Sequence, residues 1–258
     1  MLALPPAPMP GRHGLRPLKA WRYVGVFGPE LMLCAGRVRI GRATQTFWMI
    51  WDRAGVRLRE STALGAGTAR LERGRLLIDE DGVDVDLRLE ETAGIETVCP
   101  SESSYAWTRK QGGVPARGTV RIDGTALELE ARAVIDDTAA YYPRHTSWRW
   151  SAGIGVTPDA REVAWNLVSG VNDPPQSSER TVWIDGIARE VGPSAFAADL
   201  SSVDGLSFRA EASRERRENL LLVRSRYRQP FGTFTGELPD GTALAEGYGV
   251  MEYHDVHW

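Results

Sequence analysis

The sequence predicts an all-β protein made of two antiparallel β-units, barrels or sandwiches, packed side by side. Short segments throughout the chain alternate apolar and polar residues with a period of two, the period of a half-buried strand. Gly, Asp, Asn and Pro separate these segments at intervals of roughly 8–12 residues, as turns do in sandwiches and barrels. About fifteen such segments are present, more than one small barrel contains, so two units are expected.

The strands are expected to follow one another through short turns. Gly28-Pro29-Glu30 joins the first two, and the Asp-Gly pairs at 123–124, 185–186 and 240–241 are strong hairpin signals. Only Ser194–Leu200 has a helical pattern, and it is short. The expected strands are Ala20–Phe27, Leu31–Ile40, Thr44–Trp51, Arg70–Leu71, Leu76–Ile78, Val83–Leu89, Val120–Ile122, Ala126–Ala131, Ser147–Ala152, Val163–Val168, Thr181–Ile184, Leu206–Arg209, Leu220–Tyr227, Gly232–Leu238 and Ala243–His254.

The chain is expected to divide into a leader and two β-domains. Residues 1–17 contain five of the 15 prolines and are expected to be extended or disordered. Residues 18–138 would form the first domain and residues 139–258 the second, with the seam near Asp137–Arg144. A chain of 258 residues can bury a substantial core without a disulfide or a metal.

Composition argues against several classes of partner. The net charge of −3 gives no electrostatic hold on nucleic acid or on an anionic membrane. The sequence contains neither an apolar run of signal-peptide length nor the ~20 apolar residues of a membrane helix. A cytoplasmic protein without stable membrane insertion is expected, and no pattern predicts an oligomeric state. Nearly all basic residues are Arg, with Lys only at Lys19 and Lys110, which we interpret first as coding bias. Cys34 and Cys99 are expected to be free buried thiols, with a disulfide as the alternative.

The densest group of chemically useful side chains runs from Asp136 to Trp150. Indole faces suit conjugated or cationic ligands, and a carboxyl group against apolar walls has a raised pKa and can donate a proton near neutral pH. Asp136 and Asp137 are therefore candidate catalytic acids. The candidate ligand-binding residues of this segment are Tyr141, Tyr142, His145, Trp148 and Trp150. The alternative is that the aspartates are turn residues and the tryptophans are core.

The C-terminal segment carries a second candidate acid–base pair. Period two places Tyr248, Glu252 and His254 on one strand face, with Glu252 and His254 about 7 Å apart along the strand. The two could form a catalytic acid–base couple, with Tyr248 as a ligand contact, or a buried ion pair that closes a barrel. His13, His145 and His257 are the only other imidazoles, and their spacing matches no metal site.

Other candidates have an equally plain structural interpretation. Tyr105 and Trp107 alternate with polar residues and could form an aromatic wall at a barrel mouth, or pack in the core. Asn166 lies inside an apolar strand, where its amide could contact a ligand or satisfy other buried groups. Arg224, Arg226 and Arg228 share one strand face, which indicates a solvated surface or, alternatively, an anion clamp.

Motifs of the common enzyme classes do not occur. The chain has no G-x-S-x-G elbow, no phosphate-binding G-x-x-x-x-G-K-[ST] loop and no H-E-x-x-H pair, and Gly153-Ile154-Gly155 is only a fragment of a dinucleotide fingerprint. No cofactor and no metal are expected.

Several segments, taken together, resemble a known family. They are Trp21–Gly25, Tyr142–Trp150, Trp165–Gly170, Val182–Gly186, Phe231–Gly236 and Gly249–Trp258. They resemble the bacterial family termed domain of unknown function 2804. More distantly, the pattern is similar to the two-domain lipocalin-like (calycin-like) group that includes carotenoid 1,2-hydratase, tocopherol cyclase and lipocalin-like Diels–Alderases.

This resemblance implies two lipocalin-like β-domains and an isoprenoid- or polyketide-like ligand. It also implies an acidic residue that protonates an olefin, and Asp136 or Asp137 stands where the hydratase has its acidic segment. The hydratase has a His beside that acid, whereas Ile135 and Thr138 flank the pair in this chain.

Three functions follow as hypotheses. The first is a non-catalytic binder or carrier of a small, largely apolar molecule. The second is a cofactor-independent lyase or isomerase that hydrates or cyclises such a molecule after protonation by a carboxylic acid. The third is a structural protein that binds a protein partner and uses its aromatic residues only as core. Pocket chemistry separates them, because only the second needs an ionisable group in the cavity.

Overall fold

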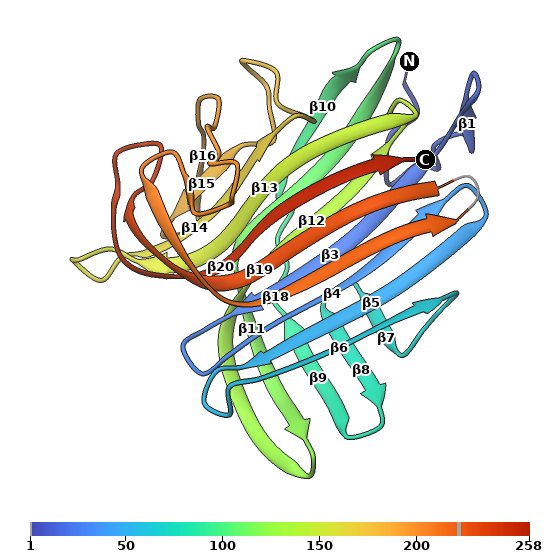
Figure 1. Cartoon of the computed structure of the whole chain (residues 1–258). Coiled ribbons are helices and arrows are strands. Elements are labelled where there is room, and N and C mark those ends of the chain that lie inside the picture. Colours follow the sequence, from blue (N-terminus) through green and yellow to red (C-terminus); the bar gives the residue numbers. More distant parts are fainter. Residues whose placement is uncertain (1, 221–222) are drawn as a thin grey trace.

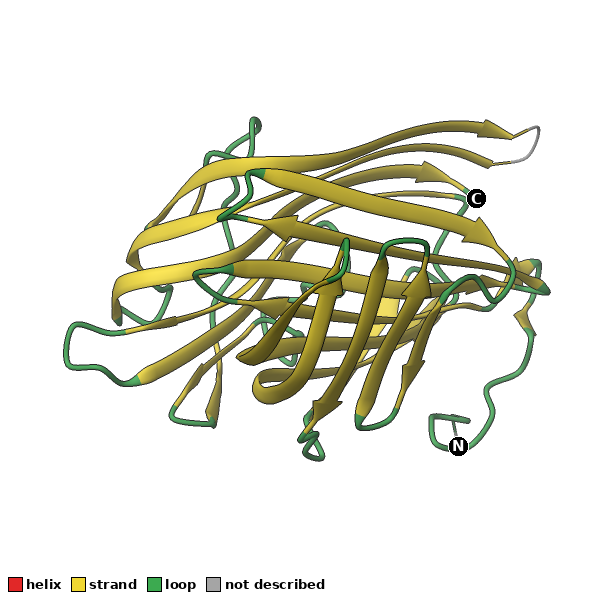
Figure 2. Cartoon of the chain, turned by 90° about the horizontal axis from the view of Figure 1, so that it is seen from below, coloured by secondary structure: helices red, strands yellow, loops and turns green. Residues whose placement is uncertain are grey.

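The computed structural model describes residues 2–220 and 223–258, and within them it contains strands and no helix (Figures 1 and 2). All strand pairs are antiparallel and form two large sheets and a two-stranded ribbon. The ribbon, β1 (Arg12–His13) and β2 (Arg16–Pro17), belongs to the leader. The predicted all-β fold with two curled sheets is therefore confirmed.

The first large sheet comprises the strands from residue 19 to residue 140. Their order is β6-β5-β4-β3-β12-β11-β9-β8-β7, with β10 paired to β11. The strands are β3 (Lys19–Phe27), β4 (Leu31–Ile40), β5 (Ala43–Asp52), β6 (Arg57–Leu64), β7 (Ala69–Glu72), β8 (Arg75–Glu80), β9 (Val83–Leu89), β10 (Ile95–Ser101), β11 (Ser104–Ile122) and β12 (Thr125–Ala140).

The second large sheet comprises the strands from residue 145 to residue 257. Their order is β16-β15-β14-β13-β20-β19-β18-β17, and the long strands cross over the first sheet (Figure 1). The strands are β13 (His145–Val156), β14 (Glu162–Ser169), β15 (Thr181–Ile184), β16 (Ile187–Glu190), β17 (Ser202–Val203), β18 (Leu206–Leu220), β19 (Val223–Glu237) and β20 (Ala243–His257).

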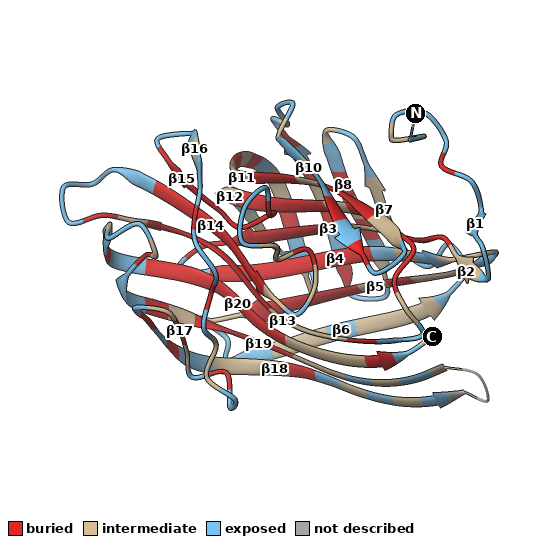
Figure 3. Cartoon of the chain, turned by 90° about the horizontal axis from the view of Figure 1, so that it is seen from above, coloured by how far each residue is buried: buried red, intermediate tan, exposed pale blue. Residues whose placement is uncertain are grey.

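Alternation along the strands divides the core into three layers. On β3, Val24 and Val26 face the interior of the curled first sheet, whereas Tyr23 and Phe27 face the second sheet. On β20, Val250 faces the first sheet and Met251 faces a third layer on the far side. The central strands are thus buried on both faces (Figure 3), which explains why β4 begins with an uninterrupted apolar run.

The hairpin signals are confirmed, but several expected elements are not. Asp123-Gly124 and Asp185-Gly186 have positive φ at both residues, as a two-residue primed turn requires. The expected helix Ser194–Leu200 is wrong: this segment is a loop that places Leu200 in the third core layer. The expected strand Leu220–Tyr227 includes residues 221–222, which lie outside the described residues, and from Val223 onward it belongs to β19.

Strand lengths exceed the expected ones where charged residues occupy both faces. β12 continues from the expected Ala126–Ala131 to Ala140, so the interpretation of Asp136 and Asp137 as turn residues is wrong. β18 likewise continues through the charged segment after Arg209. In both strands backbone pairing with long neighbours sustains the sheet where the polar alternation is lost.

Gly153 on β13 tests how tightly the side chains of neighbouring strands pack in the second sheet. It pairs with Trp165 on one side and Gly249 on the other, and a Cβ there would lie 2.3 Å from the Trp165 ring. We expect Gly153→Ala to lower the free energy of unfolding by about 1–3 kcal/mol, measured by urea denaturation, because the indole must shift. Gly192→Ala, where a Cβ meets nothing within 4 Å, is the matched control and should have little effect. Equal stability of the two variants would contradict this description.

Candidate functional site

A cavity of about 160 Å³ lies between the two large sheets. One wall comes from β3, β4, β5 and β12 of the first sheet and the other from β13, β14, β18, β19 and β20 of the second. Four indoles line it, those of Trp21, Trp148, Trp150 and Trp258. The cavity is therefore formed by the same interface that holds the middle core layer.

The indoles are held in a stacked arrangement. Trp21 on β3 stacks on Trp148 of β13, with ring centroids 6.2 Å apart and planes 9° from parallel. The ring of Tyr142 also stacks on Trp21, with the two ring centroids 5.8 Å apart. Trp150 meets the ring of Tyr23 edge-on at 5.2 Å. Such rings present flat π-faces, which suit a planar or cationic apolar group.

Glu252 is the carboxyl group at the centre of this wall. β20 places it opposite Trp150 on β13, and it is 8 % exposed. Its Oε1 accepts a hydrogen bond from Trp148 Nε1 (2.8 Å), and its Oε2 accepts one from Tyr227 Oη (3.0 Å) and one from Gln229 Nε2 (2.8 Å).

Burial decides the protonation of Glu252. Desolvation raises the pKa of its carboxyl group to about 7, although the three hydrogen-bond donors oppose this shift. The negative charge of Asp136 raises the pKa further. Three of the four lone-pair sites accept hydrogen bonds, so one on Oε1 is left for a proton. Glu252 can therefore both donate and accept a proton near neutral pH.

His254 follows Glu252 on the same face of β20 and lines the same cavity. Burial lowers the pKa of its imidazole to about 3, so the ring is neutral. Its Nε2 lies 2.8 Å from Ser225 Oγ, and its ring lies 4.4 Å from that of Trp148. The ring is therefore fixed as a neutral polar group in an aromatic wall.

A buried charge cluster closes one end of the cavity. Lys110 on β11 forms ion pairs with Asp136 on β12 and with Glu179, whose Oε2 lies 3.3 Å from Lys110 Nζ. Burial alone would lower the pKa of Lys110, but the two carboxylates outweigh it and raise that pKa. Burial raises the pKa of Glu179, and Asp136 adds to this increase while Lys110 opposes it. Two carboxyl groups thus share one ammonium group beside the cavity.

Neutral hydrogen bonds complete this cluster. Asp136 accepts hydrogen bonds from Trp21 Nε1 and Thr138 Oγ1, both at 2.9 Å. Asn172 Nδ2 donates to Glu179 Oε2 (3.0 Å) and to Tyr142 Oη (2.6 Å). Asp136 therefore ties the charge cluster to the indole wall through Trp21.

The structure brings five predicted site residues together at the cavity. They are Asp136, Trp148, Trp150, Glu252 and His254. Tyr142 lies just behind Trp21 rather than in the lining. Asp137 points to the opposite face of β12, where Arg22 Nη1 (3.0 Å) and Arg109 Nη2 (2.7 Å) pair with it. The choice between the two aspartates follows from strand alternation, since adjacent residues face opposite sides.

The other predicted residues lie elsewhere. Tyr105, Trp107 and Tyr141 pack with the leader residue Met9, and Tyr141 Oη donates to Pro10 O (2.7 Å). The described part of the leader contains a turn at residues 5–7 and the β1–β2 hairpin, and it packs against the first sheet.

Asn166, Tyr248 and His145 also lie outside the cavity lining. Asn166 is buried and accepts a hydrogen bond from Trp150 Nε1 (2.8 Å), so it orients the indole rather than a ligand. The guanidinium carbon of Arg53 lies over the Tyr248 ring, 5.0 Å from its centroid. Burial raises the pKa of Tyr248 to about 12. His145 is exposed on the outer face of the second sheet.

Sequence reasoning missed Lys110, Glu179, Tyr227 and Trp21. The signal for Lys110 was the rarity of lysine, because both lysines of this Arg-rich chain are buried. Lys19 Nζ, for example, donates to Tyr142 O at 2.8 Å. A compact ammonium group fits a buried site that a planar guanidinium with five donors cannot satisfy. Lysine in this chain therefore marks a buried polar site, an ion pair at Lys110 and a backbone carbonyl at Lys19.

Comparison with known proteins identifies the family. The family model for the domain of unknown function DUF2804 matches residues 66–258, so the chain belongs to this family. No curated protein sequence gives a significant match. No helix of the described residues is long and apolar enough to cross a membrane.

Solved structures share the fold at low sequence identity. A candidate AttH from Nitrosomonas europaea is 13% identical, with a TM-score of 0.55 over 98% of each chain. Kievitone hydratase from Nectria haematococca is 11% identical, with a TM-score of 0.55 over 91% of this chain and 88% of its own. CghA aligns with a TM-score of 0.48 and 10% identity over 97% of this chain and 93% of its own. The likeness to kievitone hydratase, with its TM-score of 0.55, confirms the lipocalin-like fold expected from the sequence.

The raised pKa of Glu252 predicts a pH-dependent stability. Glu252 binds its proton with a pKa of about 7 in the folded protein and with the ordinary glutamate pKa of 4.5 in the unfolded chain. The stabilisation is therefore full below pH 4.5 and is lost as the pH rises through 7, by an amount on the order of 3 kcal/mol. Glu252→Gln should remove this loss between pH 5 and pH 8 in urea denaturation. Glu246→Gln, an exposed neighbour on β20, should leave it intact, and an unchanged profile in Glu252→Gln would contradict the raised pKa.

The ion pairs of Lys110 predict that the free energy of unfolding depends on the charge balance of the buried cluster. Lys110→Met leaves two buried carboxyl groups without their cation and should lower the free energy of unfolding by about 3–5 kcal/mol. Adding Asp136→Asn and Glu179→Gln to this variant should restore most of the loss, because the cluster is then neutral. A Lys110→Met protein as stable as the original in thermal denaturation would show that the cluster is solvated.

Proposed function

We propose that this DUF2804 protein binds a small, largely apolar, unsaturated molecule between its sheets and transfers a proton to it from Glu252. The reaction class is that of a lyase or isomerase, a hydration or a cyclisation. The observation that carries the proposal is the position of Glu252, a buried carboxyl group with a pKa of about 7 in an indole-lined cavity. A general acid is most effective when its pKa lies near the working pH.

The indole wall supports the second part of the reaction. Protonation of a C=C bond by Glu252 forms a C–H bond, consumes the π pair and leaves a positive charge on the neighbouring carbon. The faces of Trp148 and Trp150 attract such a charge within about 6 Å of a ring centroid. A water molecule then adds and returns its proton to Glu252, or an internal C=C bond attacks and a neighbouring C–H proton returns there. In both cases Glu252 is regenerated and no cofactor is consumed.

The charge cluster supports a fixed geometry during this step. Asp136 holds Trp21, Trp21 stacks on Trp148, and Trp148 donates to Glu252. The acid is therefore positioned by a chain of contacts that leads back to Lys110. Asp136 is a positioning residue in this proposal, since its lone pairs are engaged with Lys110, Thr138 and Trp21.

The structural relatives are consistent with this class. The likeness to kievitone hydratase concerns the fold, and its name is that of an enzyme that adds water. A lipocalin-like interface that encloses a small apolar molecule is the common element on which the proposal draws.

A non-catalytic carrier is the second candidate function. It is favoured by the three hydrogen bonds that Glu252 already accepts, which would also satisfy a purely structural acid. The carrier needs the same cavity and the same indoles. A partner-binding protein with a solid core is disfavoured by the cavity itself.

The test separates binding from proton transfer. Retinol, farnesol and kievitone are titrated into the untagged protein, with quenching of tryptophan fluorescence as the readout of binding. Each bound compound is then incubated in D₂O, and deuterium incorporation and mass change are followed by mass spectrometry. Wild type should bind at least one compound and incorporate deuterium, with or without net addition of water.

Two variants distinguish the outcomes. Glu252→Gln should bind with an unchanged Kd and lose proton transfer by about 10²–10⁴-fold. Tyr248→Phe, which lies outside the cavity lining, should retain both. Binding without deuterium incorporation in wild type would establish the carrier function instead. Proton transfer that survives in Glu252→Gln, or no binding of any compound, would overturn the proposal.

A further inference from the structure

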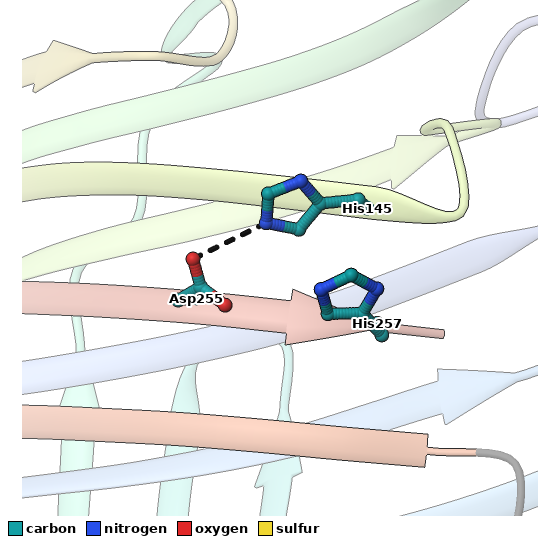
Figure 4. A group of neighbouring side chains, drawn as sticks. All are labelled: His145, Asp255 and His257. Carbon is teal, nitrogen blue, oxygen red and sulfur yellow. Dashed lines mark hydrogen bonds and ion pairs between the residues drawn. The ribbon is translucent and has the colours of Figure 1, made fainter.

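A group of three potential metal ligands lies outside the cavity, at the exposed end of the second sheet (Figure 4). His145 on β13 and His257 on β20 are directly paired across the two strands. Asp255, two residues before His257, lies on the same face of β20. This face is the outer one, because His254 and Val256, which alternate with Asp255 and His257 along β20, line the cavity on the other side.

The three side chains converge. The imidazole rings of His145 and His257 lie face to face with centroids 4.2 Å apart and planes 13° from parallel. Asp255 Oδ2 lies 3.2 Å from His145 Nε2. One ligand atom from each residue, taken together, all lie within 4.8 Å of one another.

From this geometry we propose that His145, Asp255 and His257 bind a divalent transition-metal ion, Zn²⁺, Cu²⁺ or Ni²⁺. Two imidazoles and one carboxylate are the ligand types that these ions prefer. Ligand bonds of about 2.1 Å keep two donors of one ion within about 4.2 Å of each other. The three donor atoms, which lie within 4.8 Å of one another, therefore need to approach by a few tenths of an ångström to enclose an ion.

The backbone is already fixed on both sides of the site. Trp258 N donates to Arg144 O (2.8 Å), and Trp258 Nε1 donates to Thr146 Oγ1 (3.0 Å). These bonds hold the ends of β13 and β20 together where His145 and His257 project. Binding an ion here would therefore cost the protein less conformational entropy than binding it with a mobile tail.

Neighbouring charges set an upper limit to the affinity. Arg224 and Arg226 on β19 lie opposite His257 and Asp255 in the strand register, and both arginines are exposed. Their positive charges oppose a cation, while Asp255 supplies the only formal negative charge among the three ligands. We therefore expect binding in the micromolar range, and Arg226→Gln should tighten it.

The site lies behind the cavity wall but does not depend on the proposed proton transfer. The ion would link β13 to β20, and the cavity is lined by Trp148 on β13 and by Trp258 directly after β20. Binding to the folded state alone raises the melting temperature in proportion to the logarithm of the free ion concentration. The expected outcome is a stabilised pair of strands at one end of the cavity.

The experiment titrates the untagged full-length protein with ZnCl₂, NiCl₂ and CuCl₂ by calorimetry and follows the melting temperature. Wild type should bind one ion and melt higher, and the Cu²⁺ spectrum in electron paramagnetic resonance should show two coordinated nitrogens. His145→Ala and His257→Ala should each weaken binding at least tenfold, and Asp255→Asn by a smaller factor.

Controls keep the proposal falsifiable. His13→Ala removes an exposed histidine of the leader, whose ring packs on Tyr105 and Tyr141 rather than on the three ligands, and should leave binding unchanged. Near-ultraviolet circular dichroism of each variant checks that the exposed substitutions leave the fold intact. Binding that is equal in wild type, His145→Ala and His257→Ala, a loss in His13→Ala, or no binding of any of the three ions would overturn the proposal.

Discussion

The burial of Glu252 between two sheets is the interaction on which the functional architecture depends. A carboxyl group loses its hydration there without gaining a cation, since its three partners are an indole, a phenol and an amide. Each partner is itself held. Gln229 Oε1 accepts a hydrogen bond from Cys34 Sγ (3.5 Å). Trp148 is stacked on Trp21, and the guanidinium group of Arg214 lies over the ring of Tyr227. The acid is therefore held in place, is buried, and has a pKa of about 7.

The same interface holds buried carboxyl groups in two different ways. Asp136 and Glu179 share Lys110 and so keep a charged partner, whereas Glu252 has none. Burial raises the pKa of Glu179 as well, but there Lys110 opposes the rise, whereas Glu252 has no ion-pair partner to oppose it. This contrast explains why Glu252, rather than Asp136, carries the proton-transfer role in our proposal. The two thiols take no part in it: Cys34 and Cys99 are free, and burial raises the pKa of both, to about 12 and about 11.

Local patterns in the sequence predict the strands and the faces of each strand. The period of two places Glu252 and His254 on one strand face, and Trp148 and Trp150 on another, whatever the register between strands. Turn chemistry predicted the primed hairpins at Asp123-Gly124 and Asp185-Gly186. The loop at Ser194–Leu200 was mistaken for a helix because its few apolar residues face one core layer, which a short loop achieves as readily as one helical turn.

Register over long range could not be predicted. Lys110 meets Glu179 only because the two sheets pack against each other, and His145 meets His257 only because β13 and β20 pair with a particular offset. A single sequence contains the side chains but not that offset. The same limit applies to Tyr105 and Tyr141, whose position depends on where the proline-containing leader packs. The rarity of lysine was the one compositional signal that pointed to the charge cluster.

The protonation state of Glu252 in the folded protein is the most direct test of this account. Carbon-13 NMR of protein labelled at the glutamate side-chain carboxyl carbon, with Glu252→Gln to assign the resonance, measures it. The account predicts one glutamate carboxyl that titrates with a midpoint near pH 7. A Glu252 resonance that titrates at the ordinary value for an exposed glutamate would contradict it.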